Sequence, residues 1–216
     1  MASRNISDIH TFIEFLIRKE RGQFISPAQK DMILAAGQLD AVQEWFEPYG
    51  RTQSLHDALR VIRVYQPFTS DSGGFVSYNS NYLHLIGCPF TVYGSAVTKP
   101  TMINEDEFAD AMRSQIRAVS NAYPIIIDTT NGFSIYPQSV QTGAYWYLRL
   151  PATPVYGYTQ SGRTITYNSA TSTQIEFSDI YINHIIALGL KHIGIDMDDD
   201  KVIQYAELFK QETTVT

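Results

Sequence analysis

The sequence predicts an α+β fold in which helices at the N- and C-terminal ends bracket a β-rich middle. Apolar residues recur at helical spacing in the first 63 residues and again from residue 178. Between them, short β-branched and aromatic runs alternate with turn clusters of Gly, Ser, Asn and Asp. No linker or internal repeat interrupts the 216 residues, so we expect a single α+β domain over 1–216.

Residues 1–63 are predicted to be helical. A stripe of Ile and Leu over 6–17 lies on one face of the first helix, and Gly22 suits its C-terminal cap. Ser-Pro-Ala-Gln at 26–29 combines a capping serine, a proline at the first helical position and a glutamine three residues on, which predicts a helix start. That helix is expected to end near 48–50. A third helix is expected over 54–63.

Residues 64–177 are predicted to form mainly strands, with one helix near 104–119. Acidic residues open that helix and arginines close it, an order that complements the helix dipole. Apolar runs on both sides of Thr130-Asn131-Gly132 predict a β-hairpin. Residues 178–212 are predicted to form a pair of helices, and Ser178 is expected to cap the first of them.

Composition limits the classes of function. The net charge of −6 argues against a broad phosphate-binding face, which needs clustered Lys and Arg. Aromatic residues make up 12% of the chain and include fourteen tyrosines, which can be buried against a partner at modest desolvation cost. Cys88 is the single cysteine, so no intrachain disulfide can form and we expect folding in the cytoplasm. No stretch approaches about 18 continuous apolar residues, so neither a signal peptide nor a membrane span is expected.

One spacing resembles a metal site. Asp196, Asp198, Asp200 and Glu207 stand at the ligand positions of an EF-hand calcium loop. Lys201, however, occupies the position that needs glycine for the sharp turn. We therefore interpret these aspartates as helix-capping residues and expect no metal or other cofactor.

Other candidate catalytic residues also lack a recognisable arrangement. Cys88, between a glycine and a proline at a strand end, is expected to be a buried and unreactive thiol. Asp71 and Asp128 lie in turns, where such residues hydrogen-bond their own backbone. The histidines have no short metal spacing; they are His10, His56, His84, His184 and His192. We therefore expect that the protein is not an enzyme.

The aromatic stretch 144–159 is the most distinctive part of the chain. Five aromatic rings lie within sixteen residues, and their alternation sends side chains to both faces of a strand. Core packing, a subunit interface and a platform for sugars or single-stranded nucleic acid are all compatible with it. A nucleic-acid platform would need more cations than the nearby Arg149 and Arg163. We favour core packing for the first half. The residues predicted to lie at a subunit interface are Arg149, Pro154, Tyr156 and Tyr158.

Three blocks of sequence carry a resemblance to a known family. They are 13–22 with 25–29 near the N-terminus, 148–151 with 154–158 in the middle, and 190–206 near the C-terminus. These blocks resemble virion proteins of tailed phages that infect Bacteroidota, namely ring proteins of the head-to-tail connector in crAss-like, short-tailed phages.

The resemblance implies a structural protein that forms a ring, usually twelve-fold, below the portal and lines the path of DNA. Such a protein would be made in the host cytoplasm and reside in the virion tail, beside portal, connector and tail proteins. The family has no catalytic residues. A neutral or acidic lumen would let DNA pass without binding it. The alternatives are a virion module that binds carbohydrate through the 145–158 aromatics, and a hydrolase with an unrecognised site.

Overall fold

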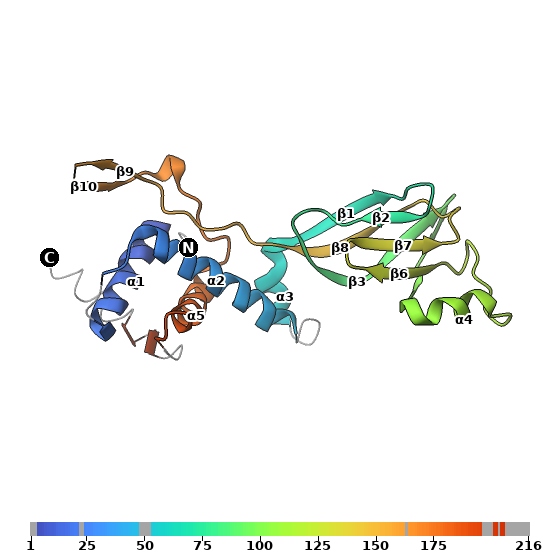
Figure 1. The fold of residues 1–216 in the computed structure, drawn as a ribbon, viewed down its shortest axis with the longest axis horizontal. Helices are drawn as coiled ribbons and strands as arrows, with labels where there is room; N and C mark the ends of the chain where they lie inside the picture. The colour runs from blue at the N-terminus through green and yellow to red at the C-terminus, as the bar shows by residue number, and fades with distance from the viewer. Residues whose placement is uncertain are drawn as a thin grey trace. The chain divides into compact units, whose positions relative to one another are not determined.

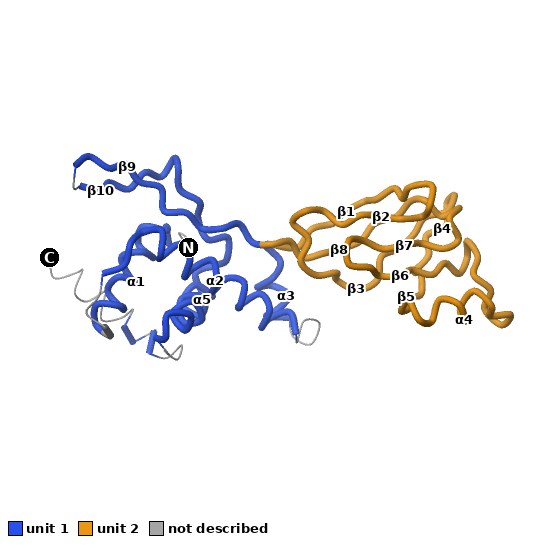
Figure 2. Tube along the Cα trace, viewed as in Figure 1, with its two compact units in different colours: residues 1–61, 151–216 blue, residues 62–150 orange. Residues whose placement is uncertain are grey.

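The computed structural model describes residues 4–21, 24–47, 53–162, 164–195, 201–202 and 204–205. Helices at both ends of the chain bracket a β-rich middle, which confirms the α+β class (Figure 1). The chain divides into two compact units (Figure 2). The single domain expected over 1–216 stays a prediction. Unit 1 comprises Met1–Val61 with Pro151–Thr216, and unit 2 comprises Ile62–Leu150.

Unit 1 contains α-helices from both ends of the chain. They are α1 (Ile6–Arg21), α2 (Pro27–Phe46), α3 (Gln53–Leu59), and α5 (Asp179–Lys191). The predicted capping box is present at the start of α2: Ser26 Oγ accepts from the Gln29 N–H, and Gln29 Oε1 accepts from the Ser26 N–H. The expected caps at Gly22 and 48–50 lie outside the described residues.

Two glycines let α2 and α5 cross with their backbones in contact. A Cβ added to Gly37 would overlap the carbonyl oxygen of Ile185 and would lie 2.9 Å from the amide nitrogen of Gly189. A Cβ on Gly189 would overlap the carbonyl oxygen of Ile33. At this crossing, close packing therefore accounts for glycine inside two helices, where it otherwise costs about 1 kcal/mol relative to alanine.

Unit 1 also contains a small hairpin. It comprises β9 (Tyr158–Ser161) and β10 (Thr164–Tyr167), which pair antiparallel. The described Gly162 adopts a φ of +62° at the turn, a conformation that glycine reaches without strain. A 3₁₀ turn, η3 (Ser169–Thr171), follows β10.

Unit 2 contains two four-stranded sheets. The first has the order β1-β8-β3-β4 and the second β2-β7-β6-β5. Neighbouring strands are antiparallel except β5 and β6, which run parallel. The strands of the first sheet are β1 (Arg63–Thr69), β3 (Tyr82–Tyr93), β4 (Ala96–Thr98) and β8 (Thr142–Arg149). Those of the second are β2 (Phe75–Ser77), β5 (Thr101–Ile103), β6 (Ile125–Thr129) and β7 (Gly132–Tyr136).

The two sheets share one aromatic core. Phe133 on β7 makes edge-to-face contacts with Phe68 on β1 and Tyr145 on β8, at centroid distances of 5.3 and 5.5 Å. The buried members are Phe68, Val76, Ile126, Phe133, Ile135, Val140, Tyr145 and Tyr147. Because they come from both sheets, the sheets pack face to face. Tyr145 and Tyr147 thus fill the core, as predicted for the first half of the 144–159 stretch.

Burial of this core predicts that unit 2 loses stability in alkali. Burial raises the pKa of Tyr145 from 10.0 to about 12, and the neighbouring Tyr147 and Tyr82 add to the rise. The unfolded chain releases this proton near pH 10 while the folded chain keeps it, so stability falls between pH 10 and about 12. Urea unfolding followed by circular dichroism at pH 8 to 11 tests this. Tyr145→Phe should flatten the decline above pH 10, and an unchanged decline would contradict the assignment.

Two elements of unit 2 differ from expectation. The helix predicted near 104–119 is shorter, consisting of η2 (Glu105–Glu107) and α4 (Phe108–Arg113). Neither segment contains a fully buried residue, and a helix without a packed apolar face gains too little to extend. Two β-prone runs, 82–88 and 90–97, predict two strands in the sequence. In the structure, β3 continues through the first run to Tyr93, with a register shift between Ile86 and Phe90, and Ala96–Thr98 form β4.

The hairpin predicted around Asn131-Gly132 is confirmed by β6 and β7. Ser178 stands at the N-cap position of α5 as expected, but its side chain makes no capping hydrogen bond. Most of the second helix of the predicted C-terminal pair lies outside the described residues. The predicted calcium-loop residues also lie outside them: Asp196, Asp198, Asp200 and Glu207. Within the described ranges, every helix is too short or too polar to traverse a bilayer.

Candidate functional site

The outer face of the β1-β8-β3-β4 sheet carries exposed aromatic side chains. Trp146 alternates with the core residues Tyr145 and Tyr147 along β8, and the strand register sets Tyr65 of β1 opposite it. The Tyr65 ring lies 4.8 Å from Trp146 and 6.3 Å from Phe90 of β3, centroid to centroid. Tyr65 is 47% exposed and Trp146 39%.

One cation belongs to this group. The Arg63 guanidinium lies 4.7 Å from the centroid of the Trp146 ring, in a cation–π contact. We call Arg63, Tyr65, Phe90 and Trp146 the aromatic face. Trp, Tyr and Arg are the residue types that dominate binding energy in protein interfaces, because they bury large areas with few rotatable bonds. The aromatic face therefore has the composition of a protein-binding surface.

The predicted interface residues belong to both compact units. Arg149 is half-buried in unit 2 and donates to the Leu150 carbonyl at 3.1 Å, while Pro154 is buried in unit 1. Tyr156 and Tyr158 do come together in unit 1, with ring centroids 6.3 Å apart. Of these two, Tyr158 is the more exposed. Their contact with a neighbouring subunit stays a prediction.

Tyr156 has a role inside unit 1. Its ring stacks on buried His10 of α1 at 4.6 Å, and its backbone N–H donates to the Asp31 carboxylate of α2 at 3.0 Å. His10 Nε2 lies 2.9 Å from Asp31 Oδ1, an ion-pair distance, although this approach is off the direction needed for a ring N–H hydrogen bond. The three residues join the 151–157 segment to α1 and α2, so we interpret the group as structural.

Two further histidines meet carboxylates where α2 packs on α5. His184 Nε2 lies 3.1 Å from Glu44 Oε2, and His192 Nε2 lies 2.7 Å from Asp40 Oδ2. These pairs were missed in the sequence because their members stand about 150 residues apart. The one-turn spacing of 40 and 44 and the two-turn spacing of 184 and 192 were the available signals. In the described ranges, no three potential metal ligands cluster, so these pairs do not define a metal centre.

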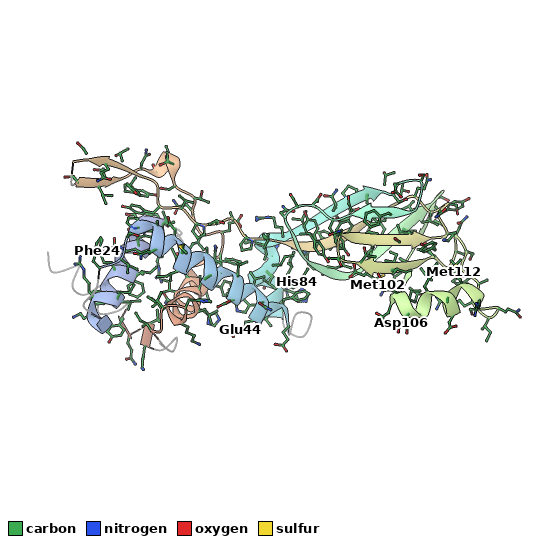
Figure 3. All side chains as sticks on the ribbon, in the orientation of Figure 1. Phe24, Glu44, His84, Met102, Asp106 and Met112 are labelled. Carbon is green, nitrogen blue, oxygen red and sulfur yellow. The ribbon has the colours of Figure 1, made fainter. Side chains whose placement is uncertain are left out.

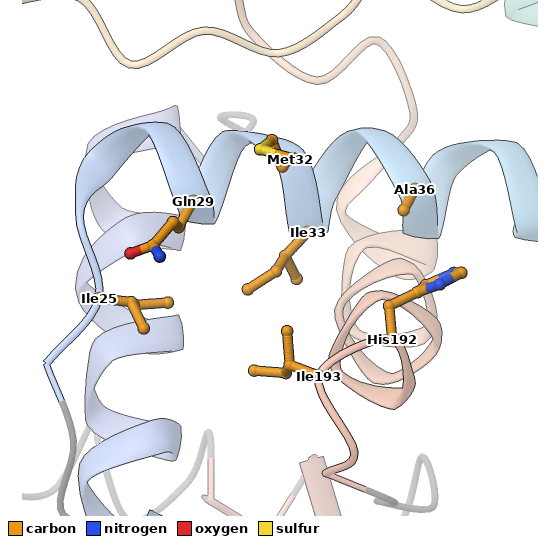
Figure 4. A pocket seen from close by; sticks show the side chains of 7 residues that line it. All are labelled: Ile25, Gln29, Met32, Ile33, Ala36, His192 and Ile193. Atoms are coloured by element: carbon orange, nitrogen blue, oxygen red, sulfur yellow. The ribbon is translucent and has the colours of Figure 1, made fainter.

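A pocket of about 370 Å³ opens beside His192 in unit 1 (Figure 4). Successive turns of α2 line one side of the pocket, because residues three and four apart share a helix face. These α2 residues are Gln29, Met32, Ile33 and Ala36. The remaining lining residues are Ile25, His192 and Ile193. The pocket is mostly apolar, and it suits a side chain rather than a charged cofactor.

The remaining candidates are explained by local structure. Asp71 accepts from the backbone N–H groups of Gly73 and Phe75, as predicted. Asp128 was expected to do the same, but it accepts from the Tyr78 hydroxyl at 2.6 Å, because the 78–82 loop brings that phenol to the end of β6. Burial and this bond raise the pKa of Tyr78. Burial also raises the pKa of the Cys88 thiol, which disfavours the nucleophilic thiolate.

Comparison with known proteins identifies no relative. No protein-family model matches the sequence, and no curated protein is significantly similar to it. A functional proposal therefore rests on the surface chemistry above and on the resemblance of the three sequence blocks.

Proposed function

We propose that the protein is a non-catalytic structural subunit, which associates with further copies of itself into a ring of a phage head-to-tail connector. The aromatic face is the observation that carries this proposal. Exposed Trp146 contacts both Tyr65 and Arg63, so the three side chains form a preorganised interface cluster, because these contacts restrict their rotamers. The connector location and the ring are what the resemblance of the three sequence blocks implies.

Charge supports a structural role beside DNA. Twenty-two acidic residues outnumber sixteen basic ones, so phosphate contacts would be few and DNA could move along such a ring. The perturbed groups also favour this role. Burial raises the pKa values of Cys88, Tyr78 and Tyr145 further above 7, which is the opposite of the shift that activates a thiol or phenol as a nucleophile.

The proposal predicts that assembly depends on the aromatic face. Tyr65→Ser with Trp146→Ser should weaken self-association by at least 30-fold, because interface hot spots each contribute about 2 kcal/mol or more. Mass photometry and negative-stain electron microscopy of the full chain, alone and coexpressed with its portal and connector proteins, measure this. Ile180→Ser, at an exposed residue of α5, is the matched control.

Two outcomes would contradict the proposal. One is that the double variant forms rings as stable as those of the unmodified protein. The other is a chain that stays monomeric in every combination and binds glycans through Trp146, which would indicate a carbohydrate-binding module instead.

A further inference from the structure

In unit 2, the end of α4 and the turn after it expose two apolar side chains next to two arginines. Ile116 is fully exposed, at 101% of its reference area. Met112, at the end of α4, is half exposed (Figure 3). Arg113 and Arg117 flank them in the sequence and are also exposed. We call residues 112–117 the knob. Leaving an isoleucine wholly in water is unfavourable, so burying Ile116 in a partner would stabilise a complex.

The knob has a defined shape. The Ser114 Oγ accepts from the backbone N–H of Arg117 at 3.3 Å, which closes the turn after α4. The Arg117 guanidinium lies 5.3 Å from the Tyr123 ring centroid. Ile116 is therefore presented from an ordered turn rather than a free chain, and less conformational entropy is lost when it binds.

The pocket of unit 1 has complementary properties. Its floor is apolar, and His192 in its lining contacts Asp40, which places a carboxylate at its edge. Glu44 stands one turn further along α2, and both carboxylates are substantially exposed. Lys191, beside His192, offsets part of this negative charge. An apolar pocket with acidic residues along one side matches an isoleucine flanked by two arginines.

We propose that the knob of one copy inserts Ile116 into the pocket of the next copy, with Arg113 and Arg117 facing Asp40 and Glu44. The occupant is a second copy of this chain, because every chain carries both the knob, with its two arginines, and this apolar pocket, with Asp40 and Glu44 beside it. The two surfaces differ, so the contact is heterologous and repeats from copy to copy, which is the contact type that rings need. This inference rests on the proposed function and names the surfaces that give the assembly its direction.

The test uses one variant on each side of the contact. Ile116→Asp disables the knob, and Ala36→Glu fills the pocket with a charge while keeping a good helix former. Each variant alone should associate about 100-fold more weakly than the unmodified protein. Mixed together, the two variants should form a one-to-one dimer and nothing larger, because only one intact knob and one intact pocket remain compatible. The controls Ile180→Asp and Ala28→Glu, at exposed residues elsewhere, should assemble normally.

A disulfide experiment gives a second readout. Met32→Cys with Ile116→Cys, in a Cys88→Ser background, should form oligomer ladders between copies on a non-reducing gel. Only intramolecular bands, or no crosslink, would overturn the inference. Normal assembly of both single-site variants would also overturn it. If those variants assemble normally while the Tyr65/Trp146 double variant does not, the proposed function stands and the knob contact fails. If the crosslinked ladders form but the chain never forms rings, the knob–pocket contact is supported and the ring of the proposed function is contradicted.

Discussion

Replacing Gly37 with alanine is expected to destabilise unit 1 by about 3 kcal/mol, the upper part of the range for overpacking. Helix propensity alone predicts the opposite, because alanine is favoured over glycine by about 1 kcal/mol inside a helix. The added methyl group would overlap the Ile185 carbonyl and approach the Gly189 backbone, and backbone atoms cannot move aside as a flexible side chain can. The two helices would have to separate.

Urea unfolding followed by circular dichroism at 222 nm measures the effect. Gly189→Ala should show the same loss, because its Cβ meets the backbone of α2 at Ile33. Ala28→Gly, at an exposed position of the same helix, serves as the control and should cost only about 1 kcal/mol. If Gly37→Ala is more stable than the unmodified protein, the backbone contact between α2 and α5 is wrong.

Phe133→Ala is expected to destabilise unit 2 by about 3–5 kcal/mol, the range for removing a buried phenylalanine. The ring is fully buried and makes aromatic contacts with Phe68, Tyr78 and Tyr145, so its loss leaves a cavity between the two sheets. Hydrogen exchange should show protection falling for amides of β6, β7 and β8. Amides of α2 and α5 should keep theirs, because these helices belong to the other compact unit.

The same Phe→Ala substitution at an exposed position is the control, because it removes the same ring without opening a buried cavity. Phe24 is 69% exposed on unit 1, so Phe24→Ala should change the free energy of unfolding by well under 1 kcal/mol if its ring contributes little packing (Figure 3). A loss below about 1 kcal/mol at Phe133 would show that the two sheets do not share the packed core described above.

The structure also changes how the 144–159 stretch is understood. Tyr145 and Tyr147 fill the core, whereas Trp146 between them joins Tyr65 and Arg63 on the outer face. The part after the prolines, where a subunit contact was expected, is partly used within unit 1 through the stacking of Tyr156 on His10. Arg63 and Tyr65 were not singled out in the sequence, because a cross-strand partner 80 residues away leaves no local signal.

The sequence by itself determined the local elements. The capping box at 26–29, the Asn131-Gly132 hairpin and the alternation along β8 depend on residues a few positions apart, and all are present. Only the tertiary structure decided three features: the division into two units, the end of α4 at Arg113 instead of near residue 119, and the packing of α2 on α5 through Gly37 and Gly189. These outcomes depend on packing between residues distant in the sequence. Periodicity shows that a face will be buried, but the partner that buries it is set by the whole fold.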